Sequence, residues 1–254
     1  MKLEVLGCAG GEGVGHRATS FLINDIILID AGSVVSSTSF EKQSTIETVL
    51  ITHPHLDHIK DLGFMVDNTF GQRLKPLQVY STQSVIDSLK KHYFNWVIWP
   101  DFTVLPSAGD PVMEMIPIHQ DIELNNLKIK NYPVNHPGGS YGYLIEDPAS
   151  DSSIIVTGDT STTELIWQAA KACKNLKAIF VDTAFPDNMN ALAEASGHYT
   201  PSQLYQQLKQ FDLLDVPIYC YHLKPAYHEL VERDVLKIGD EHFKLLKQDE
   251  ILKF

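Results

Sequence analysis

The sequence predicts an α/β protein, in which short buried strands alternate with amphipathic helices. One observation is a series of apolar runs too short for helices, such as residues 49–51 and 153–156. A second is the helical spacing of apolar residues between such runs, as at Val85, Ile86 and Leu89. A third is that histidine or aspartate follows several of these runs. The length of 254 residues suits one substantial core, so we expect residues 1–254 to form a single domain.

The net charge of the chain limits the kinds of partner that it can bind. The formal net charge is −12 at pH 7, with 44% hydrophobic and 20% charged residues. An acidic surface repels nucleic-acid phosphates, and the sequence has no basic patch, so we expect no large RNA or DNA partner. A small anionic substrate stays compatible with this charge, because bound cations reverse the local field.

The cysteines and the first residues point to a cellular compartment. Cys8, Cys173 and Cys220 are far apart and odd in number, so they imply no disulfide framework and fit a reducing cytosol. Glu4 stands where a signal peptide would have its apolar core, and no apolar run approaches membrane-spanning length. We therefore expect a cytoplasmic protein with no membrane contact.

The first half begins with a strand at residues 2–6 and a glycine-rich segment at 7–15. That segment lacks the Lys-Ser/Thr of a P-loop and a following helix, so a flexible loop beside an active site is favoured over a phosphate cradle. Residues 19–30 predict a hairpin that turns at Asn24 and Asp25, and residues 40–47 a short connecting segment. We then expect strands at 49–51 and 78–80, and helices over 59–68 and 82–91.

Residues 93–103 form the most aromatic stretch of the chain. Most aromatic side chains are buried for the area that they remove from water, so a core role is favoured. A wall on which a nucleobase stacks is the alternative.

The second half is expected to begin with strands at 113–117 and 127–130. Further strands are predicted at 141–146, 153–157, 178–182 and 216–221, with a helix over 162–172. Thr200 as N-cap and Pro201 at the first helical position predict another helix, which runs to residue 211. Residues 235–254 predict short strands and turns.

Four potential metal ligands follow the strand at 49–51 within six residues: His53, His55, Asp57 and His58. Neutral imidazole and carboxylate are ligands that Zn²⁺ prefers. In an extended segment, residues i and i+2 point the same way, so His53 and His55 can share one ion. Asp57 and His58 then face a second position. A chance cluster of surface histidines is disfavoured, because so dense a set seldom arises by chance.

This His-x-His-x-Asp-His motif after a strand resembles the signature of metallo-β-lactamase-fold hydrolases. The resemblance implies a four-layer αβ/βα sandwich and further ligands downstream. It implies that one ion is held by His53, His55 and His136, that another is held by Asp57, His58 and His222, and that Asp159 bridges the two. It also implies that Asp30 hydrogen-bonds the metal-binding loop. Roles in turns for Asp30 and His136, and a helix N-cap role for Asp159, are the alternatives.

Two divalent ions, Zn first and Mn or Fe as alternatives, are therefore the expected cofactors. Two adjacent cations acidify a water molecule and stabilise negative charge on a substrate. A purely structural metal site is disfavoured, because a catalytic site keeps positions open for water. The fold hosts several hydrolases, so the ligands alone leave the reaction undecided.

Other residues resemble the phosphodiesterase branch of this fold, most closely the class II 3′,5′-cyclic nucleotide phosphodiesterases. A His in a Gly-His-x-Thr setting contacts the phosphate there, and His198 lies in such a setting. The resemblance assigns His198 as the acid that protonates the leaving alkoxide, with Asp182 as its carboxylate partner where the branch has Glu. Asp57 is placed with them as a catalytic residue. The stretches at 94–100, 184–186 and 222–225 also resemble this branch, and for Lys224 phosphate binding and a solvated side chain stay open.

The expected function is hydrolysis of 3′,5′-cyclic nucleotides, cAMP or cGMP, to nucleoside 5′-monophosphates. A ribonuclease Z-like RNA-processing nuclease is the alternative, and the net charge of −12 opposes it. A thioester or lactone hydrolase would have no use for His198. A cyclic-nucleotide-binding or metal-sensing protein without turnover is disfavoured by the intact ligand set and the acid. The family resemblance suggests a homodimer.

Overall fold

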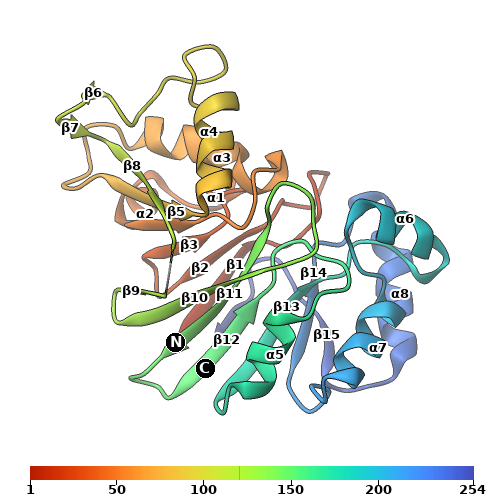
Figure 1. Cartoon of the computed structure of the whole chain (residues 1–254). Helices are drawn as coiled ribbons and strands as arrows, with labels where there is room; N and C mark the ends of the chain where they lie inside the picture. The colour runs from red at the N-terminus through yellow and green to blue at the C-terminus, as the bar shows by residue number, and fades with distance from the viewer. Residues whose placement is uncertain (120) are drawn as a thin grey trace.

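Two sheets lie face to face in the computed structural model, which describes residues 1–119 and 121–254. Within these described residues each sheet has seven strands, and helices cover the outer face of each (Figure 1). One apolar core lies between the two sheets. A second lies between the first sheet and its helices, and a third lies between the second sheet and its helices. The four-layer αβ/βα sandwich expected from the sequence is confirmed.

The first sheet has the strand order β16-β1-β2-β3-β4-β5-β8. Its strands are β1 (Lys2–Gly7), β2 (Ser20–Ile23), β3 (Ile27–Ile29), β4 (Thr48–Leu50), β5 (Leu77–Ser81), β8 (Met113–Pro117) and β16 (Ile251–Lys253). The predicted hairpin is β2 and β3, and it turns at Asn24 and Asp25, which both have a positive φ. Strands β3, β4, β5 and β8 run parallel, so their carboxyl ends share one edge.

The second sheet has the order β15-β14-β13-β12-β11-β10-β9. Its strands are β9 (Ile122–Leu124), β10 (Leu127–Pro133), β11 (Tyr141–Asp147), β12 (Ser152–Val156), β13 (Leu176–Asp182), β14 (Ile218–Tyr221) and β15 (Phe243–Leu245). Strands β12 to β15 run parallel. A separate two-stranded ribbon is formed by β6 (Pro106–Ser107) and β7 (Asp110–Pro111).

The helices pack on the outer faces of the sheets. Those in the first half of the chain are α1 (Val34–Ser37), α2 (Phe40–Thr45), α3 (Leu56–Asn68) and α4 (Gln83–His92). Those in the second half are α5 (Leu165–Ala172), α6 (Asn190–Ser196), α7 (Pro201–Gln210) and α8 (His228–Ile238), with 3-10 turns η1 (Asp187–Met189) and η2 (Pro225–Tyr227). Helix α7 starts at Pro201 with Thr200 as its N-cap, as predicted, and Thr200 with Gln203 also forms a complete capping box.

Three expectations about the elements are wrong. Residues 40–45 form helix α2, because the Ser39 side chain accepts from the amide of Lys42 and caps its first turn. Residues 113–117 pair with β5 in the first sheet and do not begin the second half. Residues 235–238, expected as strand or turn, belong to α8, which buries Val231 and Val235 one turn apart and ends at Gly239 in the left-handed conformation. The short strands expected in the rest of 235–254 are present as β15 and β16.

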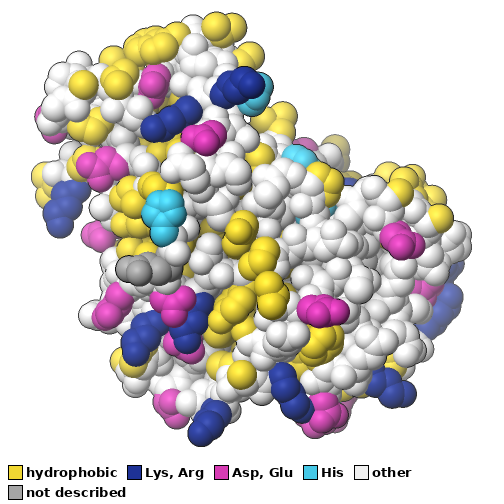
Figure 2. Space-filling model, viewed as in Figure 1, with side chains coloured by type: hydrophobic (Ala, Val, Ile, Leu, Met, Phe, Trp, Pro, Cys, Tyr) yellow, Lys and Arg dark blue, Asp and Glu magenta, His cyan; other side chains and the backbone are white. Residues whose placement is uncertain are grey.

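No helix in the described parts of the chain is long and apolar enough to cross a membrane. On the face shown in Figure 2, Lys and Arg side chains are interspersed with Asp and Glu, and histidine is visible in the notch between the helices of the two halves.

Candidate metal centre

The candidate site lies where the carboxyl ends of strands from both sheets meet. Asp30 directly follows β3, His222 directly follows β14, and Asp182 is the last residue of β13. Asp159 lies three residues beyond β12, and His53 three residues beyond β4. Parallel strands present their carboxyl ends at one edge, which is why residues far apart in sequence converge.

The structure brings together all of the predicted ligands. One potential ligand atom from each of His53, His55, His136 and Asp159 lies within 4.8 Å of the others, and the same holds for Asp57, His58 and His222. His55 is the N-cap of α3, and Asp57 and His58 lie in its first turn, so the helix begins earlier than predicted and carries half of the motif. His136 comes from the loop between β10 and β11.

The carboxylate of Asp159 lies between the two groups. Its Oδ2 atom is 3.5 Å from Nε2 of His53 and 3.1 Å from Nε2 of His222. Its Oδ1 atom is 3.3 Å from Nε2 of His58. A carboxylate in this position can contact two cations at once.

The buried polar atoms of the site test whether cations fit it. Nε2 of His53, Nε2 of His58 and Oδ1 of Asp159 are buried and have no hydrogen-bond partner among the described residues. An unsatisfied buried polar group costs about 1–3 kcal/mol. Divalent cations would satisfy all three atoms, and imidazole with carboxylate is a donor set that such cations accept. The site therefore fits divalent metal ions.

A second layer of contacts orients the imidazoles. Nδ1 of His58 is 2.7 Å from Oδ2 of Asp30, and Nδ1 of His136 is 2.9 Å from the carbonyl oxygen of Gly197. Nδ1 of His53 is 3.0 Å from Oγ1 of Thr52, and Nδ1 of His222 is 3.2 Å from Oγ1 of Thr19. With Nδ1 engaged, Nε2 of each ring is the atom left for a cation.

The protonation states of the imidazoles follow from burial and neighbours. Burial, followed by the neighbouring His58, holds the pKa of His53 well below its ordinary value. Burial also lowers the pKa of His55 and of His136, so these rings are neutral and can ligate. Burial alone would lower the pKa of His58, but the carboxylates of Asp159 and Asp30 raise it well above the ordinary value. A cation at Nε2 of His58 would replace that proton.

The glycine-rich segment at 7–15 lies beside the site, as expected, and hydrogen bonds hold it there. The amide of Gly10 donates to the carbonyl oxygen of Leu223 at 3.0 Å, and the amide of His222 donates to the carbonyl oxygen of Cys8 at 2.7 Å. A Cβ on Gly10 would lie 2.4 Å from the carbonyl oxygen of His222, so only glycine allows this approach. His222 itself has a φ of 64°, an uncommon value for a residue with a side chain.

His198 and Asp182 form a buried pair at the rim of the metal ligands. Nδ1 of His198 is 2.6 Å from Oδ2 of Asp182, which also accepts from the amide of Thr160 at 3.0 Å. The shorter aspartate thus reaches the imidazole directly. Burial alone would lower the pKa of His198, but the carboxylate of Asp182 raises it above the ordinary value. The His198 ring stacks on His222, with ring centroids 5.4 Å apart.

Lys224 places a cationic side chain at the same rim. Its Nζ atom is 3.8 Å from Oδ2 of Asp57 and 3.3 Å from Nε2 of His222, and its side chain is 27% exposed. Lys224 is thus partly buried against the site.

The aromatic stretch divides into two parts. Tyr93, Phe94 and Phe102 are buried in the core between the first sheet and its helices, as favoured from the sequence. Trp96, Val97 and Ile98 are 61–84% exposed. Ile98 also lines a cavity of about 350 Å³, as do Pro54 of the ligand-bearing loop and Leu56 at the start of α3. The stacking role stays a prediction.

Sequence reasoning missed several supporting groups. Thr52 and Thr19 contact ligand imidazoles through their hydroxyl groups, and Gly197 does so through its backbone carbonyl. Threonine and glycine occur throughout the chain, so only Thr52, next to His53, carried a positional signal.

Comparisons with known proteins agree with this geometry. The family model of the class-II cAMP phosphodiesterases matches residues 25–220. A probable 3′,5′-cyclic-nucleotide phosphodiesterase of Yersinia pestis is 24% identical, over 100% of this chain and 89% of that protein.

Two solved structures share the fold. The crystal structure of unliganded yeast PDE1 has a TM-score of 0.83 at 18% identity and covers 100% of this chain and 99% of that one. Human tRNase Z, short form, has a TM-score of 0.70 at 17% identity, with 100% and 99% coverage.

Proposed function

The chain belongs to the class-II cAMP phosphodiesterases, and from this premise we propose that it hydrolyses 3′,5′-cyclic nucleotides such as cAMP and cGMP to nucleoside 5′-monophosphates. The observation that supports this best is the buried pair of His198 and Asp182 at the rim of the seven gathered ligands. A phosphodiester needs both an activated water and a proton for its poor alkoxide leaving group.

We propose that two divalent ions occupy the site, and that zinc is the metal to test first. His53, His55 and His136 would hold one, Asp57, His58 and His222 the other, and Asp159 both. When bound, such ions supply Lewis-acid chemistry: they lower the pKa of water and neutralise charge on a phosphoryl group. Since the ligands come from both halves of the sequence, we propose that residues 1–254 form one hydrolase domain.

His198 supplies the proton in this proposal. Its Nδ1–H donates to Asp182, which fixes the ring and leaves the Nε2–H free to point toward the site. The raised pKa of His198 keeps this second proton in place near neutral pH. Transfer of the Nε2 proton to the departing 3′ oxygen then produces the 3′-hydroxyl group of the 5′-monophosphate.

Lys224 would bind the substrate anion. A cyclic phosphodiester carries one negative charge, and the ammonium group at the rim would complement it. Asp57 would position this lysine and ligate the second ion.

The remaining expectations stay predictions. A small-molecule substrate follows from the family, whereas exclusion of RNA rests on the net charge of −12 and the homodimer on resemblance. A cytoplasmic location is supported by Cys8, Cys173 and Cys220, which are free thiols in the structure.

The test of this function compares classes of substrate. Metal-loaded protein is incubated with cAMP, cGMP, a generic phosphodiester and a thioester, and the products are identified. We expect 5′-monophosphates from the cyclic nucleotides, whereas cleavage of the thioester alone would overturn the assignment.

One potential ligand atom of His198 also lies within 4.8 Å of ligand atoms of Asp159 and His222. A variant therefore has to distinguish a role of His198 as general acid from a role as metal ligand. His198→Ala should lose about 10²–10⁴-fold in turnover of cAMP and far less with a nitrophenyl phosphodiester, whose leaving group needs no proton. Its metal content should equal that of the wild type. Equal losses on both substrates, or a lost ion, would contradict the acid role.

A further inference from the structure

A second group of metal-binding side chains lies outside the metal centre. It lines a cavity of about 390 Å³ between the glycine-rich segment, the start of α8 and the segment after β15. Leu223, which directly follows the ligand His222, lines the cavity, and so do His16, His228 and Glu232.

His16 and His228 have the spacing of two imidazoles that share an ion. Their ring centroids are 4.8 Å apart, with the planes tilted by 45°. In the metal centre, the rings of His53 and His136 are also 4.8 Å apart, and those of His55 and His136 4.9 Å. Glu232 lies one helical turn beyond His228 on α8, so both side chains belong to one face of the helix.

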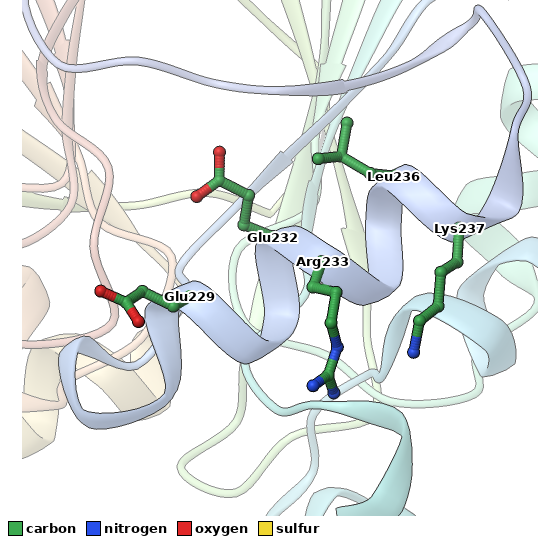
Figure 3. A pocket seen from close by; sticks show the side chains of 5 residues that line it. All are labelled: Glu229, Glu232, Arg233, Leu236 and Lys237. Carbon is green, nitrogen blue, oxygen red and sulfur yellow. The ribbon is translucent and has the colours of Figure 1, made fainter.

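Glu232 supplies a negative charge to this group, and Lys247 lines the same cavity. Arg233 and Lys237 pair with Asp234, and in Figure 3 both side chains point away from that of Glu232, although all three line one shallow pocket on α8. Glu232 forms no ion pair within residues 1–119 and 121–254. Burial, followed by the neighbouring His16, lowers the pKa of His228, so its ring is available as a ligand near neutral pH.

We propose that His16, His228 and Glu232 bind a third divalent transition-metal cation, separate from the two of the metal centre. Two imidazoles and one carboxylate are a donor set that Zn²⁺ accepts. In the structure, the ligand atoms of these three side chains do not all lie within 4.8 Å of one another. All three border an open cavity and are only half-buried, so rotation of their side chains can bring the ligand atoms together.

The third ion would act on the metal centre through the backbone. His16 exchanges two backbone hydrogen bonds with Gly13, both 3.0 Å long, and a Cβ on Gly13 would lie 3.4 Å from the Pro225 side chain. His228 is the first residue of α8 and directly follows η2. An ion held by His16 and His228 would therefore join the two elements that flank residues 222–225, which carry His222 and Lys224. We infer that it regulates turnover.

The experiment counts Zn²⁺ ions by equilibrium dialysis of the whole chain against increasing free Zn²⁺. The wild type should bind three ions per chain, the third more weakly. His16→Gln and His228→Gln should retain two ions and weaken the third by about 10–100-fold, since each removes one direct ligand. His242→Gln is the matched control, because His242 contacts Asp240 outside both sites, and it should retain three.

Three results would overturn the third site: two ions in the wild type, an unchanged third ion in His228→Gln, or its loss in His242→Gln as well, which would indicate adventitious binding. Two tightly bound ions in each variant show that the metal centre is intact. In a rate titration with cAMP, the wild type should respond to Zn²⁺ beyond two equivalents and His228→Gln should not. The same response in both would overturn the regulatory role.

Discussion

Asp30 accepts a hydrogen bond from Nδ1 of His58 at 2.7 Å and also accepts from the amide and hydroxyl groups of Thr52, both at 2.8 Å. Asp30 is 1% exposed and has a φ of 55°. One carboxylate thus connects the end of β3 to the loop that carries His53 and to the first turn of α3. The orientation of the ligands thus depends on a residue that is not itself one of the predicted ligands.

Asp30→Asn tests this support, because asparagine tolerates the left-handed backbone while losing the charge and one acceptor. We expect the affinity for Zn²⁺ to fall about 10–100-fold, as for other outer partners of ligand imidazoles. Competition with a chromophoric chelator measures it. Asp25→Asn is the matched control, since Asp25 has a φ of 65° and pairs with Lys2 away from the site. Equal affinities of both variants and the wild type would contradict the role of Asp30.

Gly10→Ala tests the contact between the glycine-rich segment and His222. The new Cβ would lie 2.4 Å from the His222 carbonyl oxygen and 2.8 Å from Cδ2 of its ring, so His222 must move. A displacement of about 1 Å at a reacting centre can cost ~100-fold in kcat/KM, and we expect a loss of that order with cAMP.

The control for Gly10→Ala is Gly109→Ala, because a Cβ on Gly109 meets nothing within 4 Å. It should keep wild-type activity. Full activity of Gly10→Ala with both ions bound would show that the segment yields without moving His222.

Lys224→Met tests whether this lysine recognises the substrate anion. Loss of a charge-assisted contact should lower kcat/KM for cAMP by about 10–100-fold, which corresponds to about 1.4–2.7 kcal/mol. A neutral ester has no anion to bind, so any rate of hydrolysis measured with it should stay unchanged. Lys130→Met is the control, since Lys130 is 30% exposed and pairs with Glu146 at 3.2 Å on the second sheet. An equal loss of activity on both substrates would mean that Lys224 supports the structure of the site and does not recognise the negative charge of the substrate.

Asp234→Asn tests a tie between α8 and the turn that follows Phe185. Asp234 is 3% exposed, and its carboxylate accepts from the amide of Asp187 at 3.0 Å and from Lys237 at 3.0 Å. Burial alone would raise the pKa of Asp234, but the hydrogen bonds from Lys237, the Asp187 amide and Arg233 lower it.

A carboxyl group whose pKa is lower in the folded state stabilises the fold above its unfolded value, near 3.8, and loses this effect as the pH falls through its folded pKa. Asp234→Asn should therefore lower the free energy of unfolding by about 1–3 kcal/mol at pH 7, and the difference should shrink below pH ~4. Urea titrations in excess chelator measure it without a contribution from metal. The exposed Asp212→Asn is the control. A difference independent of pH would exclude this electrostatic origin.

Much of the site was predictable because its signals are local. His53, His55, Asp57 and His58 occur together, and Thr200 with Pro201 marks a helix start that the structure confirms. Helix α8 was missed although Val231 and Val235 have helical spacing, and β8 was assigned to the wrong half because strand pairing depends on residues far away in sequence.

The sequence by itself determined the class of fold and the kinds of ligand, since apolar periodicity and side-chain chemistry are properties of short segments. Only the tertiary structure decided that His136, Asp159 and His222 reach one edge, that Asp182 touches His198, and that Thr19 and Gly197 support imidazoles. These contacts join residues far apart in the chain. Their distances are set by the packing of two sheets against each other, which no short segment encodes.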